Sequence, residues 1–194
     1  MHTANPHQTA TRLTLSEISQ TIPGKIVLAV SASAFVALCA HASIRLPFTP
    51  VPITLSDLAV LMVGLALGPS LAFAALLLYL AEGALGMPVF NPGPGGIAQL
   101  LGPTGGYLFA YPLAAAVTGL IGQRFKARFF PALAGAAAGS TIVMTSGVLW
   151  LTLYVHLSLA SAFFLGALPF LPGQVVKVLA AAGIVSSLKR LRRA

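Results

Sequence analysis

Charged residues are scarce in this chain, and acidic residues are the scarcest of all. Only 7% of the 194 residues are charged, and Asp and Glu together number three. A soluble globular domain carries roughly 25% charged residues, so this chain lacks the polar surface that water requires. With 57% hydrophobic residues, the sequence predicts an integral membrane protein, because lipid then solvates the outer surface.

Groups that carry catalysis or bind metals are also scarce. The one cysteine, Cys39, lies in an apolar run, which excludes a disulfide framework and a cysteine metal site. His41 and His156 lie near the outer ends of their expected spans and are far apart in the sequence, and neither His-Glu-x-x-His nor Gly-x-Ser-x-Gly occurs. We therefore predict no catalytic residue, no metal site and no cofactor, and the chain is not expected to be an enzyme.

Basic residues dominate the few charges and give the chain a net charge of +8. A surface for nucleic-acid phosphates would need a polar face on which these residues could gather. Here they lie between apolar segments instead. We interpret them as topology signals and expect no nucleic-acid partner, because Lys and Arg near span ends hold their loops on the cytoplasmic side.

Apolar runs of roughly 20 residues predict an all-α fold, an integral membrane bundle of six transmembrane helices in the lipid bilayer. The expected spans are about 25–42, two short helices within 55–85 that meet at a turn at Gly68-Pro69, and about 107–121, 131–155 and 173–188. A cleaved signal peptide is the alternative interpretation of the first apolar run, and the remaining chain would still cross the membrane several times.

Three regions follow from these spans. Residues 1–24 are a cytoplasmic N-terminal tail with one short surface helix at about 13–22. Residues 25–190 form the six-helix transmembrane substrate-binding domain, and residues 191–194 form a basic C-terminal tail.

The distribution of Lys and Arg predicts the orientation of the bundle. Six spans with both ends inside leave Arg45 outside and Lys177 within a span, and all other basic residues inside. Those inside are Arg12, Lys25, Arg124, Lys126, Arg128, Lys189, Arg190, Arg192 and Arg193. We expect a multi-pass protein of the cell (plasma) membrane with both termini cytoplasmic and its Pro- and Gly-rich loops outside.

Two of those outer loops are rich in residues that disfavour helix, so we expect a loop over 45–54 and no helix over most of 86–106. Residues 45–54 contain three prolines, and residues 86–106 combine four prolines with many glycines. A phosphate-binding loop is excluded, because no strand precedes the glycines and no Lys-Ser or Lys-Thr pair follows them. The backbone amides could line a pocket between the helices, or the segment could be a structural crossing loop.

Ionisable residues at membrane depth are costly and are therefore candidates for function. Lys177 lies one turn into the last span with Gln174 on the same face, and together they suit a carboxylate and a polar ring. The alternative is that Lys177 extends to the membrane interface. Asp57 fits an N-terminal helix contact, and Glu82 could face a cavity or reach the headgroups.

Small residues recur every four positions in the first span, at Ala29, Ser33 and Ala37. Such a face lets another helix approach closely within lipid. The sequence allows either an internal contact or a contact with a partner protein, and we predict a partner.

Five segments are specific enough to indicate a family. They are Pro47 to Leu55 (PFTPVPITL), Gly86 to Phe90 (GMPVF), Gly95-Gly96, Gly102 to Tyr107 (GPTGGY) and Leu168 to Lys177 (LPFLPGQVVK). In this order and spacing they resemble the BioY family over nearly the whole chain. That family comprises the biotin-binding S components of energy-coupling factor (ECF) transporters.

The resemblance implies a pocket near the outer face that is closed by loops and lined by helix ends. The ligand-binding residues it implies are Ser56, Asn91, Gly95, Gly96, Tyr107, Gln174 and Lys177. Two of these depart from the family pattern, which has Gln where this chain has Ser56 and Asp where it has Gln174. An amide can both donate and accept hydrogen bonds where a carboxylate only accepts, so biotin remains the expected ligand.

The resemblance implies biotin capture and uptake, energised by a separate transmembrane coupling protein and two ATPase subunits. An S component for another vitamin is the first alternative. A membrane enzyme or a passive pore is the second, although a pore needs a polar lining that these apolar spans do not supply. The sequence leaves open whether the chain acts alone, as a homo-oligomer or only with those partners.

Overall fold

The chain folds almost entirely into helices, which confirms the all-helical prediction. The computed structural model describes residues 21–90, 95–124 and 129–191. Its helices are α2 (Ile22–His41), α3 (Ser56–Leu67), α4 (Pro69–Ala84), α5 (Gly96–Leu100), α6 (Gly105–Arg124), α7 (Phe129–Val155), α8 (Leu159–Gly166), the 3₁₀ helix η1 (Leu168–Phe170) and α9 (Leu171–Leu191). Strands β1 (Ser43–Ile44) and β2 (Ile53–Thr54) form one short antiparallel hairpin.

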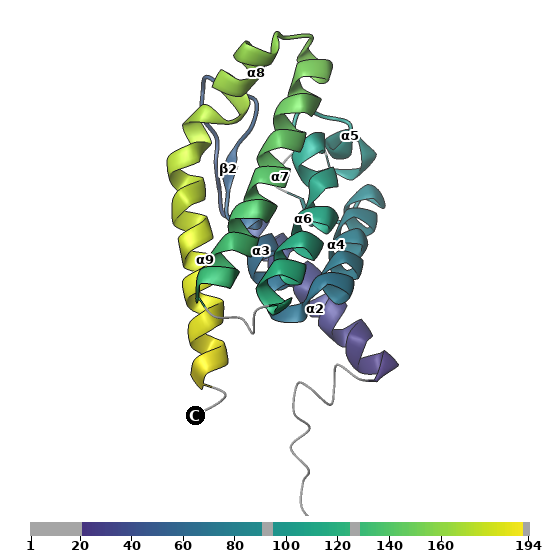
Figure 1. Ribbon diagram of the computed structural model, residues 1–194. Coiled ribbons are helices and arrows are strands. Elements are labelled where there is room, and N and C mark those ends of the chain that lie inside the picture. Colours follow the sequence, from purple (N-terminus) through teal and green to yellow (C-terminus); the bar gives the residue numbers. More distant parts are fainter. Residues whose placement is uncertain (1–20, 91–94, 125–128, 192–194) are drawn as a thin grey trace, which may run out of the picture.

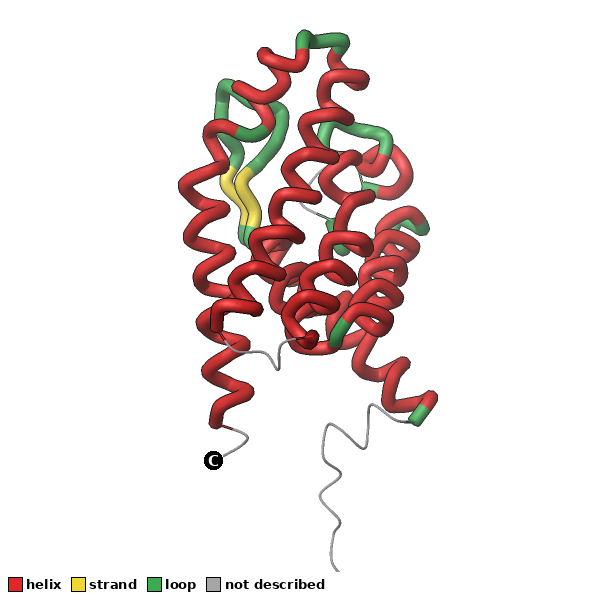
Figure 2. Tube along the Cα trace, in the orientation of Figure 1, coloured by secondary structure: helices red, strands yellow, loops and turns green. Residues whose placement is uncertain are grey.

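The helices form an elongated bundle in which α6 is the most enclosed of the long elements (Figure 1). It packs against α3, α4 and α7, while α9 packs on α3 and α7, and α2 packs on α3 and α4. The hairpin, α5 and α8 gather at the end opposite the C-terminus (Figure 2). The bundle therefore has one end made of loops and short elements and another made of the ends of long helices.

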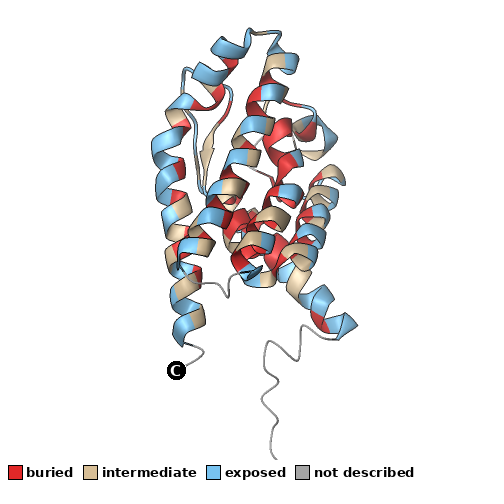
Figure 3. Ribbon diagram, viewed as in Figure 1, coloured by how far each residue is buried: buried red, intermediate tan, exposed pale blue. Residues whose placement is uncertain are grey.

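Exposed residues occur along the whole length of the bundle (Figure 3), and many of them are large hydrophobic residues. Side chains such as Phe130, Leu153 and Val176 are 65% to 77% exposed. A contiguous apolar surface of this extent is unstable in water and is the normal surface of a helix bundle in lipid. The fold thus agrees with the membrane class that the composition predicts.

Four apolar segments in the described part of the chain are long enough to cross a membrane by length and composition. They are Ile22–His41, Gly105–Arg124, Phe129–Val155 and Leu159–Leu191. Helices α3 and α4 have 12 and 16 residues, so at 1.5 Å per residue they are about 18 and 24 Å long. Both are shorter than the roughly 30 Å hydrocarbon core, so length identifies four spans where the sequence predicted six.

The first helix begins earlier than the sequence predicted. It starts at Ile22 and not near Lys25, because Thr21 caps it and Pro23 occupies its first turn, where a missing N–H does no harm. The side chain of Thr21 accepts a hydrogen bond from the amide of Gly24 at 3.2 Å. The predicted surface helix at about 13–22 lies almost wholly outside the described residues, and most of the predicted basic tail does too.

Helices α3, α6 and α7 approach one another closely below the loop end. A Cβ atom added at Gly64 of α3 would lie 2.5 Å from the carbonyl oxygen of Ala115, and one added at Gly139 of α7 would lie 2.9 Å from that of Ala114. Real Cβ atoms do not come so near to backbone, so only glycine fits at these crossings. In lipid the hydrophobic effect does not drive helices together, so close van der Waals packing of this kind holds them in contact. These crossings fix the position of α3 relative to α6.

The proline-rich segment that follows α2 forms the hairpin where the sequence predicted only a loop. Ser43 pairs with Thr54 and Ile44 pairs with Ile53, so the prolines lie in the connection between the strands. Within that connection, the hydroxyl of Thr49 donates to the carbonyl oxygen of Leu165 in α8 at 2.8 Å. The hairpin is thereby anchored at its far end and lies beside α9 (Figure 1).

Candidate ligand-binding site

A cavity lies where the hairpin, α3, α4, α6, α7 and α9 meet beneath the loop end. Its free space is about 50 Å³, which is room for a few water molecules. Leu108, Met144 and Phe170 supply part of its apolar wall. Its main polar side chains are Ser56, Asp57, Gln99, Tyr107, Tyr111 and Lys177.

An ion pair between α9 and α3 stands at the edge of this cavity. The Nζ atom of Lys177 lies 3.0 Å from Oδ2 of Asp57, and the two side chains are 8% and 13% exposed. The same oxygen accepts a hydrogen bond from Nε2 of Gln174 at 2.8 Å. Asp57 therefore supplies the anion that Lys177 needs at membrane depth, and its side chain bonds a neighbouring helix, not the end of its own as the sequence suggested.

Tyr111 extends this polar cluster to the start of α3. Its hydroxyl donates to Oδ1 of Asp57 at 2.9 Å and lies 2.7 Å from Oγ of Ser56, which lies 2.5 Å from Oγ1 of Thr54. A carboxylate only accepts and a tyrosine has one proton, so Ser56 must donate to Tyr111 and Thr54 must donate to Ser56. Asp57 thus sets the direction of the whole chain of hydrogen bonds.

Gln174 carries an acceptor with no partner. Because Asp57 can only accept, the amide nitrogen of Gln174 must face it, which leaves Oε1 on the other side. Gln174 is 5% exposed, and its Oε1 is one of two buried side-chain polar atoms without a hydrogen bond among the described residues. A buried acceptor in this state costs about 1 to 3 kcal/mol, so a ligand N–H that reached it would bind favourably.

The residues predicted from the sequence divide into two groups. Ser56, Tyr107 and Lys177 line the cavity, although the hydroxyl of Tyr107 is used to hold α8 through the carbonyl oxygen of Gly166 at 2.7 Å. Gln174 contacts Asp57 but is not among the described residues that line the cavity, and it borders an apolar groove between α7, α8 and α9 instead. Gly95 and Gly96 begin α5 with φ of 66° and 62°, and neither is among the described residues that line the cavity. The predicted contact Asn91 lies outside the described residues.

Sequence reasoning missed most of the polar lining, namely Thr54, Asp57, Tyr79, Gln99, Thr104 and Tyr111. A signal for Asp57 was present, since a chain with three acids and a lysine inside a span favours pairing the two. Tyr111 lies four residues after Tyr107, which places both rings on one face of α6. Gln99 had no such signal, because its approach to the cavity depends on how α5 folds back over the bundle.

The predicted partner face on α2 proves to be internal at its centre. Ser33 is fully buried, and its hydroxyl donates to Oε2 of Glu82 in α4. Ala29 and Ala37 are partly buried and pack against the same core. This corrects the assignment of Ser33 to a partner, and it gives Glu82 a role in joining α2 to α4 that is neither of the two expected from the sequence.

Known proteins resemble this chain over most of its length. The model of the BioY family matches residues 9–194. The chain belongs to the BioY family. This confirms the resemblance that the loop and helix motifs indicate.

Curated BioY relatives cover most of the chain. The probable biotin transporter BioY of Pyrococcus horikoshii is 42% identical over 156 residues, which are 80% of this chain and 91% of that protein. The biotin transporter BioY of Thermotoga maritima is 39% identical over 163 residues, covering 84% and 95%. A crystal structure of the S-component for biotin from an ECF-type ABC transporter matches with a TM-score of 0.78 at 28% identity, covering 88% of this chain and 91% of that one.

In this BioY chain the two departures from the family pattern belong to one polar cluster. Ser56 reaches Asp57 through Tyr111, and Gln174 bonds Asp57 directly. In this chain the carboxylate that both Gln174 and Lys177 contact comes from Asp57 on α3.

Proposed function

We propose that this chain is a membrane S component that captures biotin at the outer face of the cell membrane, for uptake driven by separate ECF coupling and ATPase subunits. The observation that carries the proposal is the buried cluster of Asp57, Gln174 and Lys177 at the cavity. The named biotin transporters and the biotin S-component that resemble the chain support the choice of ligand. The members of this family are transporter subunits and not enzymes.

The polar cluster matches the chemistry of the biotin ring. A ureido group has one carbonyl acceptor and two N–H donors, and the cluster offers the ammonium of Lys177 as a donor and the carboxylate of Asp57 as an acceptor. Each oxygen of a carboxylate accepts about two hydrogen bonds, and Oδ1 of Asp57 accepts one from Tyr111. The orphan Oε1 of Gln174 is a second acceptor.

Other residues complete the proposed pocket. The hydroxyl of Ser56 and the ring of Tyr107 lie on the cavity wall, and we retain Asn91 and the amides of Gly95 and Gly96 as proposed ligand contacts. The free space of about 50 Å³ is smaller than biotin needs, so binding must widen the cavity. The hairpin and the segment around α5 are the parts of its wall that are not long helices, and we expect them to move.

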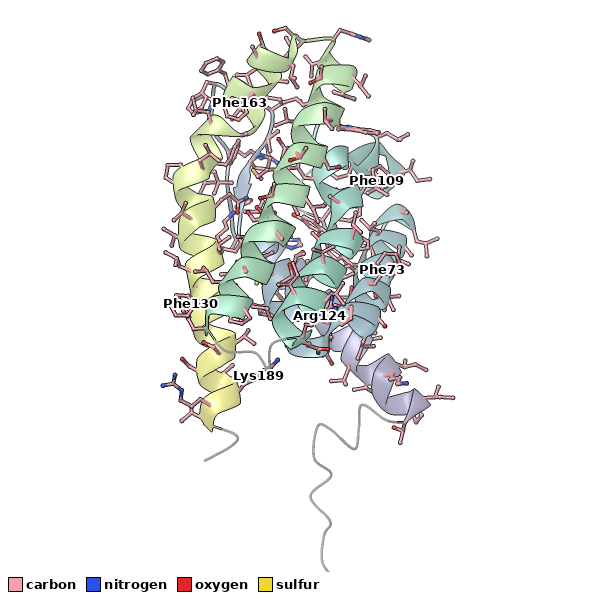
Figure 4. The ribbon with its side chains drawn as sticks, in the orientation of Figure 1. Phe73, Phe109, Arg124, Phe130, Phe163 and Lys189 are labelled. Carbon is pink, nitrogen blue, oxygen red and sulfur yellow. The ribbon has the colours of Figure 1, made fainter. Side chains whose placement is uncertain are left out.

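The bundle is proposed to cross the membrane six times with both termini in the cytoplasm. The start of α2 and the C-terminus lie at the same end of the bundle (Figure 1), and Arg124 and Lys189 lie toward that end, away from Phe163 (Figure 4). Basic residues favour the cytoplasmic side. The short helices α3 and α4 count as the second and third spans, with the hairpin and the segment around α5 continuing their paths toward the outer surface.

The coupling protein is proposed to contact the exposed side of α2. Only 22% of the residues in the most apolar stretch of this helix are buried against the rest of the chain. With Ser33 used internally, the small residues that remain exposed on α2 include Ser31 and Ala34. Small side chains permit the close helix approach that association in lipid requires.

A second candidate ligand, another vitamin, is favoured by the same two departures, Ser56 and Gln174. One experiment separates the two ligands. The protein is purified in detergent from cells grown with several vitamins, and the small molecule that co-purifies is identified by mass spectrometry. We expect biotin at up to one molecule per chain, and a different vitamin in its place would reject biotin while keeping the S-component assignment.

A further inference from the structure

Met144 of α7 separates the ligand cavity from the apolar groove between α7, α8 and α9. Within the described part of the chain, it is the only residue that lines both spaces. The groove has a volume of about 590 Å³, whereas the free space of the cavity is about 50 Å³. One side chain therefore stands between a cavity that is too small for biotin and a much larger open space.

The side chain of Met144 is suited to move from one space to the other. It is only partly buried, and methionine has three rotatable side-chain bonds and a thioether that adapts to irregular gaps. Two other apolar side chains of the cavity wall, Leu108 and Phe170, are 8% and 6% exposed and belong to the packed core. Of these three, Met144 is the one with an open groove behind it.

Gln174 connects the position of Met144 to the polar cluster. The Nε2 atom of Gln174 lies 3.8 Å from the sulfur of Met144 and 2.8 Å from Oδ2 of Asp57. Oε1 of the same amide is buried and has no partner. Gln174 lines the groove and not the cavity, so a ligand in the cavity would reach this acceptor by taking the place of the Met144 thioether.

We propose that Met144 determines specificity: its thioether withdraws into the groove as the ligand binds, and the room it leaves sets the size of ring that fits beside Gln174. The inference rests on the proposed binding of biotin, whose ureido N–H would then meet Oε1 of Gln174. The displaced thioether keeps apolar surroundings in the groove, and a buried acceptor gains the donor that it lacks.

Three proteins that differ at one position test the movement. Biotin is titrated by calorimetry in detergent into the wild type, Met144→Ala and Met144→Ile. Alanine removes the side chain that has to move, so Met144→Ala should bind biotin as tightly as the wild type or more tightly. Isoleucine has a similar volume, but its branched Cβ holds one rotamer in a helix and cannot withdraw. Met144→Ile should bind biotin about tenfold more weakly, which corresponds to about 1.4 kcal/mol.

A larger ligand tests specificity. Biotin methylated at one or the other ureido nitrogen loses a donor in every protein, but the added bulk meets Met144 only where Met144 is present. We expect the preference for biotin over one of the two methylated forms to be about tenfold smaller in Met144→Ala than in the wild type, a factor within the range for one extra methyl group in a packed site. Leu108→Ala is the matched control, because it opens the fixed part of the wall and should keep the wild-type preference.

A wall residue that only fills space would give the opposite order, with Met144→Ala weaker than Met144→Ile, and that order would overturn the proposal. An unchanged preference against both methylated forms in Met144→Ala would overturn it too. Unfolding in detergent without ligand checks that each variant is folded, and Met144→Val repeats the test of a branched side chain if Met144→Ile is not. A folded wild type that binds no biotin would overturn the proposed function itself, so the two failures are distinguishable.

Discussion

Replacing Asp57 by Asn removes one charge from the buried ion pair while keeping the size of the side chain. Lys177 would then be an ammonium at membrane depth whose side chain is 8% exposed and whose anionic partner is gone. Breaking a buried pair in this way typically costs about 3 to 5 kcal/mol. An Asn oxygen can still accept from Gln174 and Lys177, so we expect a loss near the lower limit, about 3 kcal/mol.

The assay is the free energy of unfolding in detergent for Asp57→Asn, Lys177→Met and the double variant. Asp57→Asn leaves the ammonium of Lys177 unpaired, and Lys177→Met leaves the carboxylate of Asp57 unpaired. The double variant has neither charge, so the two losses of unfolding free energy should not add. We expect the double variant to be more stable than the sum of the single losses predicts by about 2 kcal/mol, within the range for residues in contact. Strictly additive losses would refute the argument that this pair holds α9 against α3.

Three further expectations follow from the same contacts. Gln174→Asp sets a second carboxylate beside Asp57, and because Lys177 can neutralise only one of them, biotin affinity should change little or fall. A large gain in affinity, measured by calorimetry, would indicate a pocket evolved for another ligand. Ala34→Trp should reduce recovery of the complex with the coupling protein without weakening biotin binding, whereas Ala34→Ser should not, and an intact complex with Trp would leave this face to lipid. A reporter fused after Arg128 should report the cytoplasm, and an external signal would reverse the orientation.

Hydropathy and proline placement were enough to predict the longer helices, because each depends on residues that are close in the sequence, but they did not predict α5 and α8. The turn at Gly68-Pro69 and the breaks around 45–54 and 86–106 were predicted for that reason. The length of a span is a weaker inference. Composition indicated that α3 and α4 are spans, but α3 begins only after the hairpin and α4 ends at the turn around Gly86, so both helices are short.

The polar site could be predicted only in part, because its residues meet across distant helices. Lys177 and Gln174 were visible as rare polar residues in an apolar span. Asp57 is 120 residues away from Lys177, and nothing local distinguishes a carboxylate that caps its own helix from one that pairs across the bundle. The packing partner of Ser33 could not be predicted either. Small residues at every fourth position predict that another helix packs closely against α2, but they do not identify that helix.

The central claim, that the cluster of Asp57, Gln174 and Lys177 binds biotin, is tested most directly by titrating biotin into ligand-free wild type and Lys177→Met by calorimetry. Methionine keeps an apolar stem of similar length and removes the ammonium donor. The account predicts saturable binding of one biotin per wild-type chain and a loss of roughly 1.5 to 3 kcal/mol in the variant, the range for a hydrogen bond to a charged group. A folded Lys177→Met protein that binds biotin as tightly as the wild type would contradict it.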